Sequence, residues 1–515
     1  MKINGYFLAG SLAWLTAASV VAQPNPNSGH NNDQRSVREV PVRNSNGRNW
    51  QNNNSINSEN TRNNTADSST DSNSNTVEEE SPTDTTVDNP TETTTDETSN
   101  TSNNNEDTSS DVNEDNSGSS DNSTISGNEE SSVTESSGTT WIINSTNERA
   151  PYIYESNSNQ QVLVNVQSIE SVTVAGKEYT RVSATGIPDY QIEITQEILD
   201  ALISRPKAST DFVNGYPLVQ TGEVVSFGQD IGYRSNSSCG SEAGYGFWPP
   251  GPVCPENVDH VGYIPAEPEA STDSCETGLG VQGYWVNGTS IYQWSDGQSV
   301  NNTWHTLAPM AEVYDVDICG GHAANGDYHH HFYSNCLAEI AGDTADGHSP
   351  IYGYTADGYA IYGPWEDAGV LAKSSWAIRD YDDPRSDTGC GVAGQRSCLL
   401  VDEYDIDRGV SNTNNTGPTT SGSYTSQSGN EFETPAGFFY EDYYWDESLT
   451  AQGGEYLDQF NGHTDSERGY HYHLTVTQDN NGQLIPAFPF TFGPRFAGKL
   501  DDQTIVNRCS TTVGR

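Results

Sequence analysis

A histidine pattern occurs twice in this sequence, which contains only 11 histidines among 515 residues. Residues 317–331 read D-I-C-G-G-H-A-A-N-G-D-Y-H-H-H, and residues 458–473 read D-Q-F-N-G-H-T-D-S-E-R-G-Y-H-Y-H. Each copy has an Asp, a Gly-His pair, a glycine-containing turn and a Tyr-His-x-His segment. The matching histidines are His322, His329, His331, His463, His471 and His473. Because imidazole nitrogens are good transition-metal ligands, the pattern predicts a metal site.

The spacing of the last two histidines in each copy suits a β-strand. Successive side chains on a strand point to opposite faces, so a His-x-His pair presents two imidazoles on one face. We therefore expect His330, the middle residue of the first copy, to pack or face solvent rather than bind the ion. Each copy could hold one ion through its own three histidines, or the two strands could share a single ion. The spacing is compatible with both arrangements.

Three further side chains are candidates for the same site. Asp317 and Asp458 precede the two Gly-His pairs at matching positions. They could be ligands, but we favour a role as acceptors that fix the imidazole tautomer. His348 follows the first copy and is a candidate additional ligand. The alternative for all of these histidines is hydrogen bonding to buried backbone and packing against the neighbouring tyrosines.

The residues that surround the motifs predict a mainly β fold. Residues 161–183 and 190–195 alternate as strands do, with a turn at Gly176, and only residues 195–204 have the apolar spacing of a helix. Beyond Phe212 the chain is rich in Gly, Tyr and Trp. All eight cysteines also lie beyond Phe212, and Cys390 and Cys398 are close enough for a local pair. We expect a disulfide-stapled β domain with long loops and, from the duplicated motif, a candidate internal pseudo-twofold repeat.

Composition divides the chain into four segments. Residues 1–22 have the pattern of a secretory signal peptide, and residues 23–139 are acidic, rich in Asn, Ser and Thr, and expected to be disordered. Residues 140–212 are expected to form a β-rich N-terminal part of the folded region, and residues 213–515 the main domain. No later segment approaches the roughly 20 consecutive apolar residues that a membrane span needs. We expect a secreted or cell-surface protein.

The formal net charge of -50 restricts the partners of the protein. Nucleic acids and anionic membrane surfaces are disfavoured by repulsion, whereas cations are favoured. Tyr359, Tyr362 and Trp365 could stack on carbohydrate, although a core role is favoured for them. The candidate partners are a metal ion and a polysaccharide of the cell wall or extracellular matrix. Copper or zinc suits the imidazoles best, and calcium is a second candidate because it prefers oxygen ligands.

The chain resembles the YHYH domain family, whose exported proteins are named for a Tyr-His-Tyr-His motif. That motif is intact at residues 470–473, and a Tyr-His-His-His variant stands at residues 328–331. Residues 287–297, N-G-T-S-I-Y-Q-W-S-D-G, and residues 348–365, H-S-P-I-Y-G-Y-T-A-D-G-Y-A-I-Y-G-P-W, also resemble the family. The resemblance spans about residues 215–497 and excludes the acidic tail. It supports the domain assignment and implies no particular activity.

Three functions are compatible with these observations. The first is a secreted transition-metal-binding protein that holds its ion through the duplicated histidines. The second is a metal-dependent hydrolase or oxidase that uses the same ion, although the sequence identifies no catalytic residue. The third is a structural protein of the cell wall or matrix whose acidic tail binds calcium or mineral. Metal content separates the first two from the third.

Overall fold

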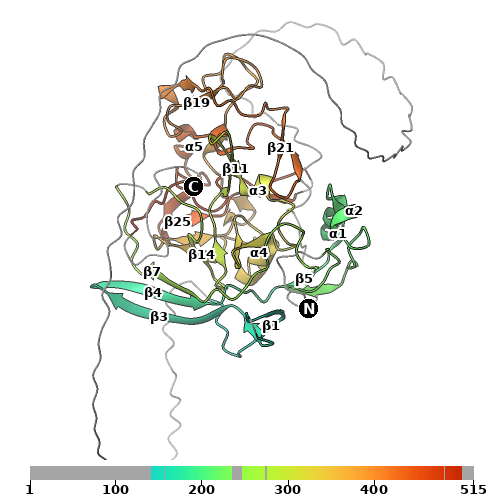
Figure 1. The fold of residues 1–515 in the computed structure, drawn as a ribbon. Helices are drawn as coiled ribbons and strands as arrows, with labels where there is room; N and C mark the ends of the chain where they lie inside the picture. Colours follow the sequence, from blue (N-terminus) through green and yellow to red (C-terminus); the bar gives the residue numbers. More distant parts are fainter. Residues whose placement is uncertain (1–140, 157, 235–245, 273–274, 481, 501–515) are drawn as a thin grey trace, which may run out of the picture. The chain divides into compact units, whose positions relative to one another are not determined.

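The computed structural model describes residues 141–500, except residues 157, 235–245, 273–274 and 481 (Figure 1). The described residues belong to one compact unit. The predicted signal peptide and acidic tail lie outside the described residues. Strands predominate in the described part of the chain, so the prediction of a mainly β fold is confirmed.

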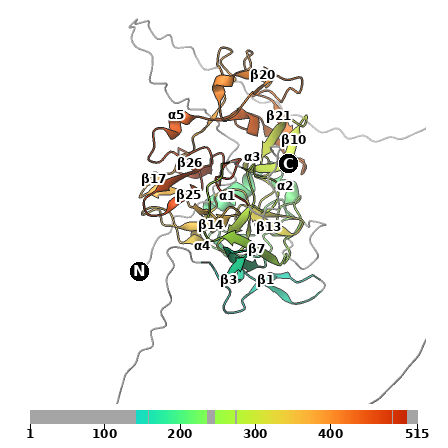
Figure 2. The ribbon, with the colours of Figure 1, turned by 90° about the vertical axis from the view of Figure 1, so that its left-hand side faces the viewer.

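An eight-stranded sheet lies at the centre of the fold (Figure 2). Its members, from one edge to the other, are β12 (Gly321–Ala324), β13 (Asp327–His330), β9 (Ser290–Ile291), β8 (Gly283–Trp285), β14 (Ile351–Thr355), β15 (Ala360–Tyr362), β25 (Gly469–His473) and β24 (Gly462–Asp465). The two histidine motifs therefore form the outermost hairpins, β12–β13 and β24–β25. Both expected Tyr-His-x-His strands are present, β13 ending one residue before His331.

The strands pair in the same way on both sides of this sheet. At its centre β8 and β14 are antiparallel, with Tyr284 opposite Tyr354. Outside them, β13 runs parallel to β9 and β25 runs parallel to β15. Gly283 pairs with Ile291 just as Gly353 pairs with Ile361. The two halves thus have matching registers, while the sequence repeat itself stays a prediction.

A second sheet and several strand pairs surround the central sheet. The three-stranded sheet contains β3 (Val166–Val174), β4 (Lys177–Ala184) and β7 (His260–Pro265), and β3 and β4 form the long ribbon at the lower edge of Figure 1. The strand pairs are β1 (Arg149–Tyr154) with β2 (Gln161–Leu163), β5 (Gln191–Glu193) with β6 (Val224–Ser226), β10 (Ser295–Val300) with β11 (Trp304–Leu307), β16 (Trp365–Asp367) with β17 (Val370–Leu371), β18 (Trp376–Ile378) with β23 (Tyr443–Trp445), β19 (Cys398–Leu400) with β20 (Val410–Asn412), β21 (Ser423–Thr425) with β22 (Glu431–Glu433), and β26 (Val476–Gln478) with β27 (Leu484–Pro486).

The helices are short. They are α1 (Gln196–Ser204), α2 (Ala208–Asp211), α3 (Ala308–Ala311), α4 (Asn335–Ala341) and α5 (Glu447–Thr450), with 3₁₀ turns at η1 (Ile406–Arg408) and η2 (Tyr440–Asp442). Helix α1 is the one that the apolar spacing predicts, and the hydroxyl of Thr195 caps it by accepting from the Ile198 amide. The sequence does not predict α4, which is shorter than two full turns of a helix.

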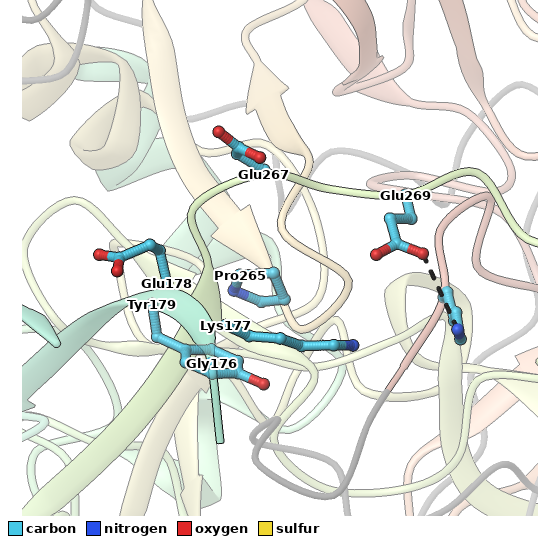
Figure 3. A pocket seen from close by; sticks show the side chains of 8 residues that line it. Gly176, Lys177, Glu178, Tyr179, Pro265, Glu267 and Glu269 are labelled. Atoms are coloured by element: carbon cyan, nitrogen blue, oxygen red, sulfur yellow. Dashed lines mark ion pairs between the residues drawn. The ribbon is translucent and has the colours of Figure 1, made fainter. Parts of the chain in front are cut away.

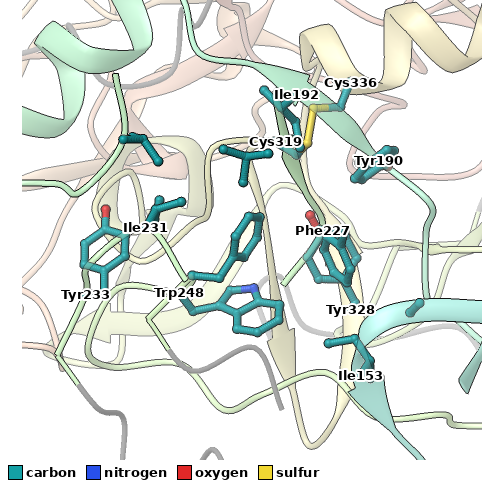
Figure 4. Packing of buried hydrophobic residues seen from close by; sticks show 14 of the residues in the cluster. Ile153, Tyr190, Ile192, Phe227, Ile231, Tyr233, Trp248, Cys319, Tyr328 and Cys336 are labelled. Carbon is teal, nitrogen blue, oxygen red and sulfur yellow. A yellow bond between two sulfur atoms is a disulfide. The ribbon is translucent and has the colours of Figure 1, made fainter. Parts of the chain in front are cut away.

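One hydrophobic cluster connects the first histidine hairpin to the N-terminal part of the fold (Figure 4). Tyr328, the tyrosine of the Tyr-His-His-His segment, is fully buried there, and its ring centroid lies 4.9 Å from that of Phe227. The disulfide between Cys319 and Cys336 joins the same cluster and links α4 to the turn that precedes β12. A second disulfide joins Cys390 and Cys398, as predicted. The first hairpin is therefore held by packing and by a covalent link.

Candidate metal centres

In each hairpin, the turn between the two strands brings the histidines of that copy together. In the first hairpin the two-residue turn Asn325-Gly326 has φ values of 53° and 86°, as a type I′ turn requires, and it places His322 directly opposite His329. In the second hairpin His463 lies opposite His471, and Gly469, with φ of 71°, ends a longer turn. The extra residue of the second copy is thus absorbed by the turn, and the histidines keep the same register.

The three-histidine centre consists of His322, His329, His331 and Glu312. The Nε2 atoms of His329 and His331 are 3.1 Å apart. Glu312, just after α3, places its Oε2 atom 3.5 Å from the Nε2 atoms of both His322 and His331. All three imidazoles are buried. Four side chains from three segments therefore converge on one point.

The four-histidine centre consists of His348, His463, His471, His473 and Glu366. The Nε2 atom of His471 lies 3.3 Å from that of His348, 3.2 Å from that of His463 and 3.2 Å from that of His473. Glu366 on β16 places its Oε2 atom 3.2 Å from His463 Nε2 and 3.4 Å from His473 Nε2. His348 thus joins the second motif, although it follows the first in sequence.

Backbone carbonyls fix the orientation of most of these rings. The Nδ1 atoms of His329, His348, His471 and His473 donate to the carbonyls of Asp327, Ser349, Gly469 and Gly363 at 2.7 to 3.0 Å, and Nδ1 of His331 donates to the Gln293 carbonyl. A carbonyl can only accept, so the proton of each neutral ring sits on Nδ1. The unprotonated Nε2 atoms of these five rings therefore face the centres.

Burial keeps the imidazoles neutral and disfavours ionised carboxylates. It lowers the pKa of His322 to about 4 and that of His471 to about 4. Burial likewise raises the pKa of Glu366 to about 7, and burial and the neighbouring Asp296 and Asp315 raise the pKa of Glu312. The Oε2 atoms of Glu312 and Glu366 are buried and accept no hydrogen bond. When its glutamate is ionised, each centre is therefore a group of hydrogen-bond acceptors that lacks a donor.

The two aspartates of the motifs hold the tyrosines and the turns. The Tyr328 hydroxyl donates to Asp317 at 2.8 Å, and the Cys319 amide donates to the same carboxylate at 2.8 Å. Asp458 accepts from Tyr470 at 3.0 Å in the corresponding place. This role differs from the one expected, because backbone carbonyls and not these carboxylates accept the Nδ1 protons. Burial raises the pKa of Asp317 to about 7.

The other histidines of the described part of the chain lie outside both centres. His330 is fully buried, and its Nε2 atom is 3.0 Å from the Tyr190 hydroxyl, so it packs on the opposite face from the ligand candidates as predicted. His305 pairs with Glu441, and the Nε2 atom of His260 lies 3.0 Å from Asp327. None of these three belongs to the candidate ligand groups found among residues 141–500, apart from the gaps in that range.

The two centres are far apart. The hairpins occupy opposite edges of the central sheet, and β9, β8, β14 and β15 lie between β13 and β25. With adjacent strands about 4.8 Å apart, five strand steps amount to roughly 24 Å. The single shared ion that the sequence left open is incompatible with this arrangement. Each copy gathers its own ligands.

Comparison with known proteins identifies the part of the chain that holds both centres. Residues 262–483 match the family model described as YHYH protein. They form a YHYH domain. The resemblance expected from the sequence is confirmed, and the matched range includes every residue of both centres. No curated protein matches the chain, and no solved structure matches it.

Two residues of the YHYH domain were missed by sequence reasoning. Glu312 and Glu366 lie outside both histidine motifs and do not occupy matching positions in the two halves of the sheet. Glu312 follows α3, whereas Glu366 lies on β16, just after β15. The only available signal was the position of Glu366 next to a segment that resembles the family. Their approach to the histidines depends on tertiary contacts and not on local spacing.

The three-histidine centre of the YHYH domain opens into a cleft of about 730 Å³. A separate hollow of about 270 Å³ lies between the β3–β4 turn and the segment after β7 (Figure 3). That hollow is lined by charges of both signs, including the ion pair of Glu269 with Lys499 at 3.8 Å, and by no histidine. In the described part of the chain no helix is long and apolar enough to cross a membrane.

Proposed function

We propose that this protein is an exported YHYH protein that binds two transition-metal ions, one at each centre. One observation carries the proposal. In both centres, imidazole rings donate through Nδ1 to backbone carbonyls, so their Nε2 atoms are free to accept. These Nε2 atoms converge with a buried carboxylate oxygen to which no group donates a hydrogen bond. Facing acceptors without a donor are costly in a buried environment. A bound cation would turn each group of acceptors into a ligand set.

The separations of the donor atoms support a metal of the zinc or copper type. Imidazoles at about 2.0–2.1 Å from one ion have nitrogens roughly 3 to 3.4 Å apart. The Nε2 separations of 3.1 to 3.3 Å fall within that range. Three or four imidazoles with one carboxylate suit zinc or copper, whereas calcium requires mostly oxygen ligands. Calcium therefore remains a candidate for the acidic tail, which lies outside the described residues.

Export is supported by the disulfides. Those of Cys319 with Cys336 and Cys390 with Cys398 are typical of oxidising compartments. The signal peptide over residues 1–22 stays a prediction. So does glycosylation of the acidic tail, whose sequons at Asn53, Asn63, Asn100 and Asn122 would be acceptors in a eukaryotic host. A polysaccharide partner in the cell wall or matrix also stays a prediction.

Metal titration tests the proposal. The full chain would be purified without an affinity tag, stripped with a chelator and titrated with Zn²⁺, the bound metal being measured by mass spectrometry. We expect two equivalents. The double variant His471→Ala, His473→Ala should bind one equivalent, and so should His329→Ala, His331→Ala, because each removes ligands from one centre only.

The control is His305→Ala, which lies outside both centres and should retain two equivalents. Circular dichroism of each variant checks that the fold is intact. Failure of the stripped protein to take up either Zn²⁺ or Cu²⁺ would show that the histidines are structural. Uptake that is unchanged in the double variants would show that the ligands lie elsewhere.

A further inference from the structure

The two centres differ in one ligand. Three histidines and one glutamate are common to both, but only the second centre has a further imidazole, His348. Its Nε2 atom lies 3.3 Å from that of His471, and its Nδ1 atom donates to the Ser349 carbonyl at 2.8 Å. His348 is therefore held in a ligating orientation. With it, an ion in the second centre would have five protein ligands, whereas an ion in the first would have four.

The matching registers identify what replaces His348 in the first centre. Gly283 pairs with Ile291 and Gly353 pairs with Ile361, so these glycines occupy equivalent positions in the two halves of the sheet. Counted back from them, the position of His348 corresponds to Gly278. Glycine has no side chain, so nothing from this position can reach the ion.

The residues that follow Gly278 line the cleft beside the three-histidine centre. His322, His329 and His331 line it, and so do Leu279 and Gly280, which directly follow Gly278. Residues 426–428 line the cleft as well. Its volume of about 730 Å³ is within the range of small-molecule sites. The missing ligand and the open space therefore coincide.

The charges around the cleft select the kind of molecule that can enter. Asp296, Glu312 and Asp315 line it, and the described lining residues include no lysine or arginine. Three carboxylates in one lining repel anions, although Arg205 and Lys207 act on Asp315 from outside it. The polar groups of Tyr292, Ser426 and Ser428 line the same space. A small neutral molecule with a nitrogen or oxygen donor fits this environment better than an anion does.

We propose that the ion of the three-histidine centre has an exchangeable position facing the cleft, which takes a small neutral nitrogen or oxygen donor, and that the ion of the four-histidine centre is closed to such ligands. This inference rests on the proposed two-ion function. It assigns different roles to the centres: the first exchanges external ligands, and the second holds its ion with protein side chains.

Single-centre variants loaded with Cu²⁺ test the inference. His463→Ala, His471→Ala leaves only the three-histidine centre, and His322→Ala, His329→Ala leaves only the four-histidine centre. Imidazole and azide would be titrated at about pH 8, where imidazole is mostly neutral, while the copper absorption and paramagnetic resonance spectra are recorded. We expect imidazole to change the spectra of the three-histidine protein at a concentration at least about tenfold lower than for the four-histidine protein, and azide to act more weakly than imidazole.

A third variant reverses the difference. His348→Gly in the four-histidine protein should make its spectra respond to imidazole. Copper bound to both proteins with equal responses, or with no response from the three-histidine protein, would overturn the inference and leave the two-ion function standing. Stronger binding of azide than of imidazole would overturn the assignment to neutral ligands. Absence of copper from both proteins would instead refute the two-ion function and, with it, this inference.

Discussion

Replacing Glu366 by glutamine should have opposite effects on the metal-free and the metal-loaded protein. In the metal-free protein at a pH above the raised Glu366 pKa of about 7, this carboxylate is ionised. Its Oε2 atom then faces the Nε2 atoms of His463 and His473 at 3.2 and 3.4 Å and has no donor. The Glu366→Gln amide is neutral and can donate to an Nε2 atom. An unsatisfied buried polar group costs about 1–3 kcal/mol, and partial solvent access at Glu366 places the expected gain near the lower end, about 1 kcal/mol.

In the metal-loaded protein the same change removes a negatively charged ligand. Changes beyond the direct ligands of a metal already cost about 10–100-fold in affinity, so loss of this ligand should weaken Zn²⁺ binding by at least about tenfold. Urea unfolding with a chelator present measures the stability of the metal-free protein. Competition with a chromophoric chelator measures the Zn²⁺ affinity.

The matched control is Glu455→Gln. Glu455 pairs with Lys373 at the surface, at 3.0 Å, and its substitution should change neither quantity measurably. If Glu366→Gln instead destabilised the metal-free protein, the Glu366 carboxylate would not be unfavourably placed against the Nε2 atoms of His463 and His473. Unchanged Zn²⁺ affinity would refute its role as a ligand.

Three further predictions concern the framework of the domain. Burial raises the folded-state pKa of Asp317 to about 7, above its unfolded value, so its protonated form stabilises the fold at low pH and this stability is lost as the pH rises through 7. Between about pH 5.5 and 8.5 the loss is about 2 kcal/mol, and Asp317→Asn should abolish this part of the pH dependence in chelator-containing urea titrations; an identical slope would contradict the burial argument. Asp442→Asn should destabilise the domain by about 3–5 kcal/mol, because it breaks the fully buried pair with Arg396 at 2.7 Å, and a loss below about 1 kcal/mol in the same assay would contradict this. Replacing Cys319 and Cys336 by serine should cost about 3 kcal/mol, since the disulfide closes a loop of 17 residues, and an unchanged unfolding midpoint would count against a stabilising role.

The local part of the fold could be predicted from the sequence, and the long-range part could not. The alternation of strands predicts that His471 and His473 share a face while His330 points away, because side-chain direction depends only on neighbouring residues. Thr195 and the apolar spacing after it likewise predict α1. These features require no knowledge of the tertiary structure.

The ligands from other segments depend on the strand order. His348 belongs to the second centre because it precedes β14, and only β15 separates β14 from β25. The parallel pairing of β15 with β25 is not encoded by local spacing. Glu312 and Glu366 reach their centres from loops and strand ends that carry no motif. The sequence therefore predicts all seven imidazoles as candidates and leaves open whether they form one centre or two. It predicts neither the carboxylates nor which centre His348 joins.

The position of the histidine hairpins at the sheet edges affects how the protein opens. Each hairpin joins the sheet through a parallel ladder of two residue pairs, His329 and His330 in one and Tyr472 and His473 in the other. Such edges can separate by local unfolding while the centre of the sheet stays folded. An ion that connects a hairpin to a glutamate on another segment would oppose this opening. Slowed amide exchange in β12 and β24, with little change in β8 and β14, would then be the earliest sign that metal has bound.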